Sequence, residues 1–189
     1  TYGSGDQVSC RNTADAVSKL LLNAKINNYA SVTMDAVPLY NDLVGGVEVT
    51  VLDDFTGIDD TLVKGETITL NGEQALKYVQ SRKGVADSSN ESRMARQKQY
   101  LEALNNKTRE CINSNDKFVF DACVKMSDYL VSNCTVNQLQ NLFNKISQYE
   151  FCGIRYLEGE SVAGDRFMEF YPSEESVKSQ VVSLFYDKK

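Results

Sequence analysis

The sequence predicts a mixed α/β sandwich, and three observations indicate it. Strand-like and helix-like segments alternate along the 189 residues, a pattern typical of layered α/β folds. The segment 47–51 (Val-Glu-Val-Thr-Val) alternates strictly between apolar and polar residues, as a half-buried strand does. Apolar residues make up 42% and charged residues 24% of the chain, so a chain of this length can bury a core without metal or disulfide cross-links.

The first half of the chain is predicted to alternate between helices and strands. Residues 12–24 place Ala14, Val17 and Leu20 at helical spacing, with Asn12 or Thr13 as the N-cap. Gly45-Gly46 is a helix stop, and Asn71 is a cap for the helix that follows it. Strands are predicted at 28–34, 47–51 and 67–70, and helices at 12–24, 36–44, 72–81 and 90–110.

The second half is predicted to be mainly helical, with one pair of strands. Helices are expected at 116–131 and 135–149, the second capped by Thr135. Strands are expected at 151–157 and 166–171 and are predicted to pair. A last helix is expected after Ser173, and its apolar stripe consists of Val177, Val181, Val182 and Phe185.

Charge and composition exclude several classes of function. The net charge is −6, whereas proteins that bind nucleic acid through its phosphates usually show a basic balance. We therefore expect no nucleic-acid partner. The chain contains no histidine, which excludes Ser-His-Asp and Cys-His catalysis and zinc sites built on histidine.

The five cysteines form no CxxC pair, so zinc ribbons and thioredoxin-like redox motifs are not indicated. Four of them fall within 111–152. They would form two disulfides in an extracellular chain, with Cys10 left free, or all five would be unpaired thiols. The sequence leaves both alternatives open.

The acidic segment 53–66 contains Asp53, Asp54, Asp59 and Asp60. Its aspartates could bind calcium or magnesium, but their spacing does not match an EF-hand loop. We therefore predict a solvated surface loop there and no metal ligand in this chain. No run of 18 apolar residues occurs, and the opening Thr-Tyr-Gly-Ser-Gly leads us to expect an anchor or leader upstream.

A polar constellation in the segment 80–100 carries the predicted chemistry. Within the helix 90–110, positions 93, 96, 97 and 100 share one face because they are spaced i, i+3, i+4 and i+7. The residues at these positions are Arg93, Arg96, Gln97 and Tyr100. Arg82 ends the preceding helix, across a loop at 83–89 that is short enough to bring it near this face.

Arg93 falls in the first turn of its helix, where a positive side chain is disfavoured by the helix dipole. A bound anion reverses this, because guanidinium forks suit phosphate oxygens and the free helix N–H groups point at them. We therefore predict a cationic pocket for a phosphate-bearing ligand, built by Arg82, Arg93, Arg96 and Gln97. In the alternative interpretation these side chains are solvated or paired with Glu91 and Glu102.

Three ordered blocks of the sequence support the pocket. They are Leu43–Val51, Leu70–Val79, and Arg82 followed by Ser92–Gln97. In sequence and spacing they resemble the LytR-CpsA-Psr family over about residues 1–105. The resemblance implies an α/β/α sandwich with a mixed central sheet. It also implies one domain over 1–189, in which 1–110 carries the ligand site and 111–189 completes the fold.

The resemblance also implies a function. The family transfers glycopolymers, such as wall teichoic acid or capsular polysaccharide, from a polyprenyl-pyrophosphate carrier to peptidoglycan, mainly in Gram-positive bacteria. It implies a phosphotransferase on the extracellular face of the cell membrane, held there by an upstream anchor. A non-catalytic or regulatory module that binds polyprenyl phosphate or a cell-wall polymer is the alternative.

Site residues are carried over from the resemblance position by position. Arg82 and Arg93 match the arginines that bind the pyrophosphate and are the expected catalytic residues. Gln80, Arg96 and Gln97 are further substrate-binding candidates, although Arg96 could instead be structural. Gln80 stands where the family commonly has an arginine, and Asn90 where an aspartate is common. Mg²⁺ is expected for the intact family fold, with its ligands on N-terminal strands outside this chain.

Overall fold

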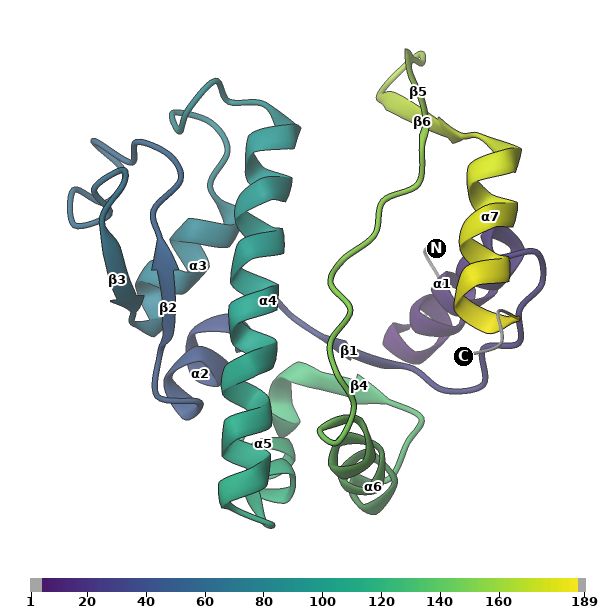
Figure 1. Cartoon of the computed structure of the whole chain (residues 1–189), viewed down its shortest axis with the longest axis horizontal. Coiled ribbons are helices and arrows are strands. Elements are labelled where there is room, and N and C mark those ends of the chain that lie inside the picture. The colour runs from purple at the N-terminus through teal and green to yellow at the C-terminus, as the bar shows by residue number, and fades with distance from the viewer. Residues whose placement is uncertain (1–4, 187–189) are drawn as a thin grey trace. The chain divides into compact units, whose positions relative to one another are not determined.

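A computed structural model describes residues 5–186 (Figure 1). These residues fall into two compact units. A terminal unit consists of the segments 5–30 and 155–186, and a middle unit consists of Ser31–Ile154. All of the predicted site residues lie in the middle unit. The prediction of a single domain stays a prediction.

The middle unit mixes helices with short strands, which confirms the predicted α/β class. Its helices are α2 (Ala36–Leu43), α3 (Gly72–Gln80), α4 (Asn90–Ser114), α5 (Phe118–Lys125), the 3-10 turn η1 (Ser127–Tyr129) and α6 (Val136–Ile146). Its strands are β2 (Val47–Thr50), β3 (Thr67–Leu70) and β4 (Leu130–Ser132), and β1 (Ala30–Val32) begins at the boundary with the terminal unit.

The strands of the described residues pair two by two, as β1–β4, β2–β3 and β5–β6. β2 and β3 are antiparallel, with Val47 opposite Leu70 and Thr50 opposite Thr67. One face of β2 is buried through Val47 and Val49, while Glu48 on the other face is exposed. This is the alternation that predicted the strand, and the buried face is the centre of the core of the middle unit.

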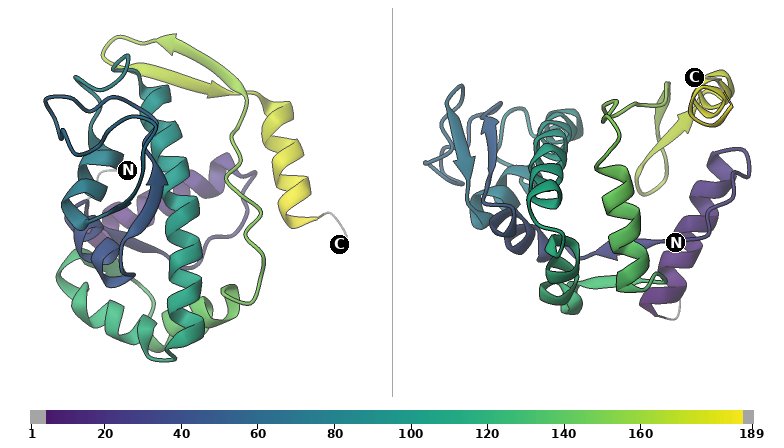
Figure 2. Two further views of the ribbon diagram at one scale, coloured as in Figure 1. Left: turned by 60° about the vertical axis from the view of Figure 1, so that its left-hand side comes forward. Right: turned by 60° about the horizontal axis from the view of Figure 1, so that its bottom comes forward.

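Helix α4 runs beside β2 in each view and also packs on α3 (Figure 1, Figure 2). α3 begins with a capping box, in which the Asn71 side chain accepts from Gln74 N and the Gln74 side chain accepts from Asn71 N. α3 also lies close against α2. A Cβ on Gly72 would come within 2.6 Å of the Pro38 carbonyl oxygen, so only glycine permits this approach.

The turn between α2 and β2 depends on two glycines. Gly45 and Gly46 have φ values of 84° and 87°, in the left-handed region that favours glycine. The chain reverses there and delivers Val47 into the core. This confirms the predicted helix stop, and it fixes where β2 begins.

The terminal unit contains α1 (Asp6–Leu20), the antiparallel hairpin of β5 (Gly159–Ala163) and β6 (Met168–Pro172), and α7 (Glu174–Phe185). The Ser173 side chain caps α7 by accepting from Ser176 N. Val177 and Val181 of the predicted stripe are buried, but Val182 and Phe185 are 49% and 57% exposed. Only the first half of the apolar stripe is therefore part of the core.

Several predicted boundaries are wrong, and three of them differ most. α1 begins at Asp6 rather than at residue 12, and Gly5 is at its N-cap position. The predicted helix 116–131 ends at Lys125, after which the chain forms η1 and β4. No strand covers 151–157, because the hairpin starts two residues later, at Gly159. Short apolar segments near chain turns do not define a period, so local pattern does not fix such boundaries.

All five cysteines are free thiols in the structure. Of the two alternatives that the sequence left open, the structure therefore shows the unpaired one. Cys111 and Cys123 pack against the core of the middle unit, and burial raises the pKa of both thiols.

Candidate functional site

The candidate site is centred on the connection between α3 and α4. α3 ends because Ser81 is extended, with ψ at 135°, and its N–H still bonds to Lys77 O. The connecting loop, 82–89, is short and anchored. Val85 is only 1% exposed, its N–H bonds to Arg82 O at 3.3 Å and its carbonyl accepts from Ser88 N at 2.9 Å.

The loop has an unusual backbone. Gly84, Ala86 and Ser88 have φ values of 78°, 49° and 58°. Two of these residues are not glycine, and such residues rarely adopt the left-handed region without compensating contacts. The buried Val85 side chain and the Ser88 N–H bond to Val85 supply such contacts. The loop therefore has a defined path between α3 and α4.

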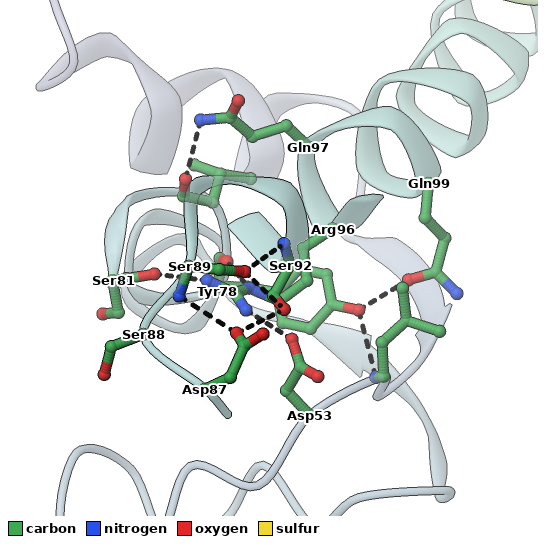
Figure 3. Close-up of polar contacts among 12 residues, drawn as sticks. Asp53, Tyr78, Ser81, Asp87, Ser88, Ser89, Ser92, Arg96, Gln97 and Gln99 are labelled. Carbon is green, nitrogen blue, oxygen red and sulfur yellow. Dashed lines mark hydrogen bonds and ion pairs between the residues drawn. The ribbon is translucent and has the colours of Figure 1, made fainter. Parts of the chain in front are cut away.

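Helix α4 begins with a double cap (Figure 3). The Ser89 hydroxyl accepts from Ser92 N at 3.0 Å. The Asp87 carboxylate accepts from Ser89 N at 3.0 Å and from the Ser92 hydroxyl at 2.8 Å. The hydrogen bonds from Ser89, followed by the one from Ser92, lower the pKa of Asp87 to about 2. Asp87 therefore acts as a charged cap on the helix.

Arg93 is half-buried in the first turns of α4. Its Nη2 donates to the Asn90 Oδ1 at 2.6 Å. Its Nε is shielded from solvent and has no hydrogen-bond acceptor. A buried donor without an acceptor is costly, and Asn90 is neutral, so the positive charge of Arg93 is uncompensated. An anion beside this helix end would supply both the acceptor and the charge.

Arg82 follows α3 directly and is exposed, as is Gln80. In the part of the chain that the structure describes, the ion pairs involve other residues, and neither Arg82 nor Arg93 forms one. The two arginines border the two ends of one anchored loop. The cationic pocket predicted from these arginines stays a prediction.

Arg96 was predicted to bind the ligand, but its side chain is buried inside the protein. It is 1% exposed, and all three nitrogens of its guanidinium are occupied by the protein (Figure 3). Nε donates to Tyr78 O at 2.9 Å, Nη1 pairs with Asp53 and Nη2 donates to Ser81 O. Its Cζ also lies 5.3 Å from the centre of the Phe55 ring. This burial argues against ligand binding by Arg96, which supports the site from beneath.

Gln97 is half-buried beside Arg96. Its Nε2 donates to Val79 O at 2.9 Å, so its amide nitrogen is also used to join α4 to α3. The four residues predicted to share one face of the helix therefore have two different environments. Arg93 lies toward the loop, whereas Arg96, Gln97 and the buried Tyr100 pack against neighbouring elements.

Asp53 is the site residue whose role the sequence did not reveal. It was grouped with a solvated acidic loop, yet its side chain is only 15% exposed and pairs with Arg96. Its position is held by Tyr78, whose hydroxyl accepts from Leu52 N at 3.3 Å and donates to Gln99 Oε1 at 2.6 Å. Desolvation raises the pKa of Tyr78 to about 12, so this hydroxyl stays protonated and able to donate.

The described part of the chain contains no cluster of metal-binding side chains. No group of three or more His, Cys, Asp or Glu side chains is placed there to hold a metal ion. Two carboxylates of the site already have partners, since Asp53 pairs with Arg96 and Asp87 accepts hydrogen bonds at the start of α4. The magnesium dependence expected from the resemblance stays a prediction.

Two surface hollows lie away from the arginines. One, of about 820 Å³, lies over α7 in the terminal unit and includes Glu174 and Lys178. The other, of about 420 Å³, lies over the acidic loop and includes Asp54, Asp60 and Lys64. Neither includes a predicted site residue. Over residues 5–186, no helix is long and apolar enough to cross a membrane.

Comparison with known proteins adds the family. The model of the LytR_cpsA_psr family matches residues 10–180. No curated protein matches the sequence.

Solved structures share the fold at low sequence identity. A protein of Enterococcus faecalis described as a transcriptional regulator is 22% identical with a TM-score of 0.74, over 92% of this chain and 63% of its own. TagU of Bacillus subtilis is 21% identical with a TM-score of 0.62, over 95% and 73% of the two chains. TagT of B. subtilis is 23% identical with a TM-score of 0.66, over 90% and 64%. TagT has also been solved bound to LI-WTA, a complex that matches with a TM-score of 0.68.

Proposed function

Because the chain belongs to the LytR-CpsA-Psr family, we propose that it transfers a glycopolymer from a polyprenyl-pyrophosphate carrier to peptidoglycan at the cell envelope. Cell-wall glycopolymer transfer is the activity of the family. The pyrophosphate carrier, the peptidoglycan acceptor and a place on the extracellular face of the membrane are the parts proposed for this chain. Wall teichoic acid is the favoured polymer, since the related TagT has been solved with LI-WTA.

One observation supports the proposal most. Arg82 and Arg93 border the two ends of the anchored loop 82–89 and lack carboxylate partners in the described residues. Arg93 in addition has a shielded Nε without an acceptor. A diphosphate supplies charge and acceptor oxygens to both guanidinium groups at once, which suits their planar forks better than a single carboxylate does.

The proposed reaction is a phosphoryl transfer. A hydroxyl of the acceptor sugar attacks the phosphorus atom that carries the glycopolymer, and a new P–O bond forms. The bond from that phosphorus to the bridging oxygen breaks, so polyprenyl phosphate leaves and the hydroxyl proton is released to water. Arg82 and Arg93 stabilise the negative charge that grows on the phosphoryl and leaving oxygens. Loss of one such donor costs on the order of 100-fold in rate.

Two observations favour the alternative, a binding module without catalysis. Gln80 offers only a neutral hydrogen bond where a second arginine would sit, and it is exposed. The carboxylates of Asp53 and Asp87 already have partners within the protein, since Asp53 pairs with Arg96 and Asp87 accepts from Ser89 N. Such a module would hold polyprenyl pyrophosphate through the same two arginines and would not turn it over.

The test uses the full chain in two assays. Calorimetric titration with farnesyl pyrophosphate measures binding. Incubation with farnesyl-pyrophosphoryl-N-acetylglucosamine and a soluble peptidoglycan oligosaccharide measures release of farnesyl phosphate. The variant Arg82→Ala Arg93→Ala is compared with Arg11→Ala Arg166→Ala, which removes the same charge from exposed positions of the terminal unit.

We expect binding and turnover by the wild type and by the control, and loss of both in the site variant. Each charged hydrogen bond contributes about 1.5–3 kcal/mol, so the dissociation constant should rise by roughly 10- to 100-fold for each arginine. Tight binding without release of farnesyl phosphate would favour the binding module. Equal binding by both double variants would refute the proposed site.

A further inference from the structure

Helix α3 ends with carbonyl groups that have no partner within the helix, as every α-helix does. Two adjacent side chains of α4 satisfy three of them. Arg96 donates to the carbonyls of Tyr78 and Ser81, and Gln97 donates to that of Val79. A cation at this end also suits the helix dipole. The last turn of α3, from which the chain continues directly into Arg82, is therefore capped by α4.

This cap requires a buried positive charge, which is costly unless it is paired. Asp53 supplies the pair through its bond to Arg96 Nη1. The backbone before Asp53 is held by two side chains. The Tyr78 hydroxyl accepts from Leu52 N and donates to Gln99, and Gln99 Nε2 donates to Thr50 O. The carboxylate of Asp53, three residues after β2, thus pairs with the α4 arginine that bonds to the end of α3.

From this geometry we infer that Asp53 is a positioning residue for the phosphate-binding arginines, acting through Arg96. Arg96 follows Arg93 by three residues on α4, and it holds the carbonyl of Ser81, the residue before Arg82. The separation of Arg82 and Arg93 is therefore set by the Asp53–Arg96 pair beneath them. Neither Asp53 nor Arg96 contacts the ligand. This inference rests on the proposed function, because it names what holds the proposed site in place.

The neighbouring Asp54 provides a matched control. It is exposed, and its carboxylate accepts hydrogen bonds from the N–H and the hydroxyl of Thr56, within its own loop. Asp53→Asn and Asp54→Asn make the same chemical change one residue apart. Asp53→Asn should weaken farnesyl pyrophosphate binding by about tenfold or more, since displacing a positioned group by 1 Å can cost on the order of 100-fold. Asp54→Asn should bind as the wild type does.

Asp53→Asn also leaves the Arg96 charge buried without its partner, so this variant could bind poorly only because it is unstable. The double variant Asp53→Leu Arg96→Met removes both charges, and apolar replacement of a buried ion pair is often neutral for folding. It lacks the cap on α3 but retains Arg82 and Arg93. We expect a thermal midpoint close to that of the wild type, together with the same loss of binding as in Asp53→Asn.

Hydrogen exchange separates failure of this inference from failure of the proposed function. In Asp53→Asn and in the double variant, backbone amides of residues 82–92 should exchange at least several-fold faster, while those of β2 and of the α4 centre should not change. A double variant that folds, binds as the wild type does and keeps this loop protected would overturn the positioning role. If the wild type itself fails to bind the probe, the proposed function fails, and the exchange rates still decide the role of Asp53.

Discussion

The side-chain amide of Gln97 donates a hydrogen bond of 2.9 Å to the backbone carbonyl of Val79. This bond joins the second turn of α4 to the last turn of α3, across the loop that separates the two helices in sequence. The contact between the two helices therefore does not depend on the loop 82–89, whose backbone is left-handed at Ala86 and Ser88. Arg82 follows the C-cap of α3 and Arg93 lies in the first turns of α4, so the two arginines lie at the ends of helices that this bond joins.

Asn90 accepts a hydrogen bond from Arg93 without compensating its charge. Because Asn90 accepts from Arg93 Nη2 at 2.6 Å, the substitution Asn90→Asp would place a carboxylate on the same guanidinium and compete with an anionic ligand. An exposed ion pair contributes about 0.3–1 kcal/mol, so we expect farnesyl pyrophosphate affinity to fall roughly two- to fivefold. Asn106→Asp adds the same charge at an exposed position further along α4. If the two variants bind equally well, the local effect of Asn90 is refuted.

Asp87 should make stability depend on pH at acidic values. Its pKa in the folded chain is about 2, below the ordinary value of 3.8. A carboxylate whose pKa is lowered by folding stabilises the folded state at pH values above its ordinary pKa, and this contribution is lost as the pH falls through the folded value. Asp87→Ala should therefore lower the thermal midpoint at pH 7, and the difference from the wild type should shrink between about pH 4 and pH 2.

Asp116→Ala is the control for this pH series. Asp116 is exposed, and its carboxylate makes no hydrogen bond or ion pair in the described range 5–186. The difference in thermal midpoint between Asp116→Ala and the wild type should stay nearly constant across the same pH range. A midpoint difference for Asp87→Ala that stays constant from pH 7 to pH 2 would show that the cap does not depend on the charge of Asp87.

Asn41 is a buried polar residue of the middle unit. It is completely buried, donates to Leu70 O at 2.8 Å and accepts from the Tyr100 hydroxyl at 3.2 Å. Asn41→Leu has a similar size but leaves both partners unsatisfied, which costs about 1–3 kcal/mol for each buried group. Denaturant unfolding should show this loss. Tyr100→Phe, which removes only one hydroxyl, should cost less, and the opposite order would contradict this account.

Local chemistry made several parts of the fold predictable. The caps predicted at Asn71 and Thr135 are confirmed, because a side chain that accepts a backbone N–H three residues on is a short-range feature. The strand β2 is confirmed because its alternation matches a sheet with one buried face. The position of Arg93 near the start of α4 follows from the same short-range signals.

Contacts between distant segments were not predictable in this way. The pairing of Arg96 with Asp53 spans 43 residues, and helical spacing alone could not distinguish a buried arginine from one that faces a ligand. The start of α1 and the start of the hairpin were misplaced for a related reason. Residues of α1 are all at least partly exposed, so their apolar spacing carried little information about burial.

The central claim is that Arg82 and Arg93 hold one diphosphate together. The most direct measurement is a titration of the ¹⁵N-labelled full chain with inorganic pyrophosphate, followed through the Nε–H resonances of its arginines. We expect the resonances of Arg82 and Arg93 to shift with one common saturation curve, the Arg93 Nε gaining its missing acceptor. The resonance of Arg96, bonded to Tyr78 O, should not move. Saturating pyrophosphate that shifts neither Arg82 nor Arg93, or shifts them no more than Arg11, would contradict the account.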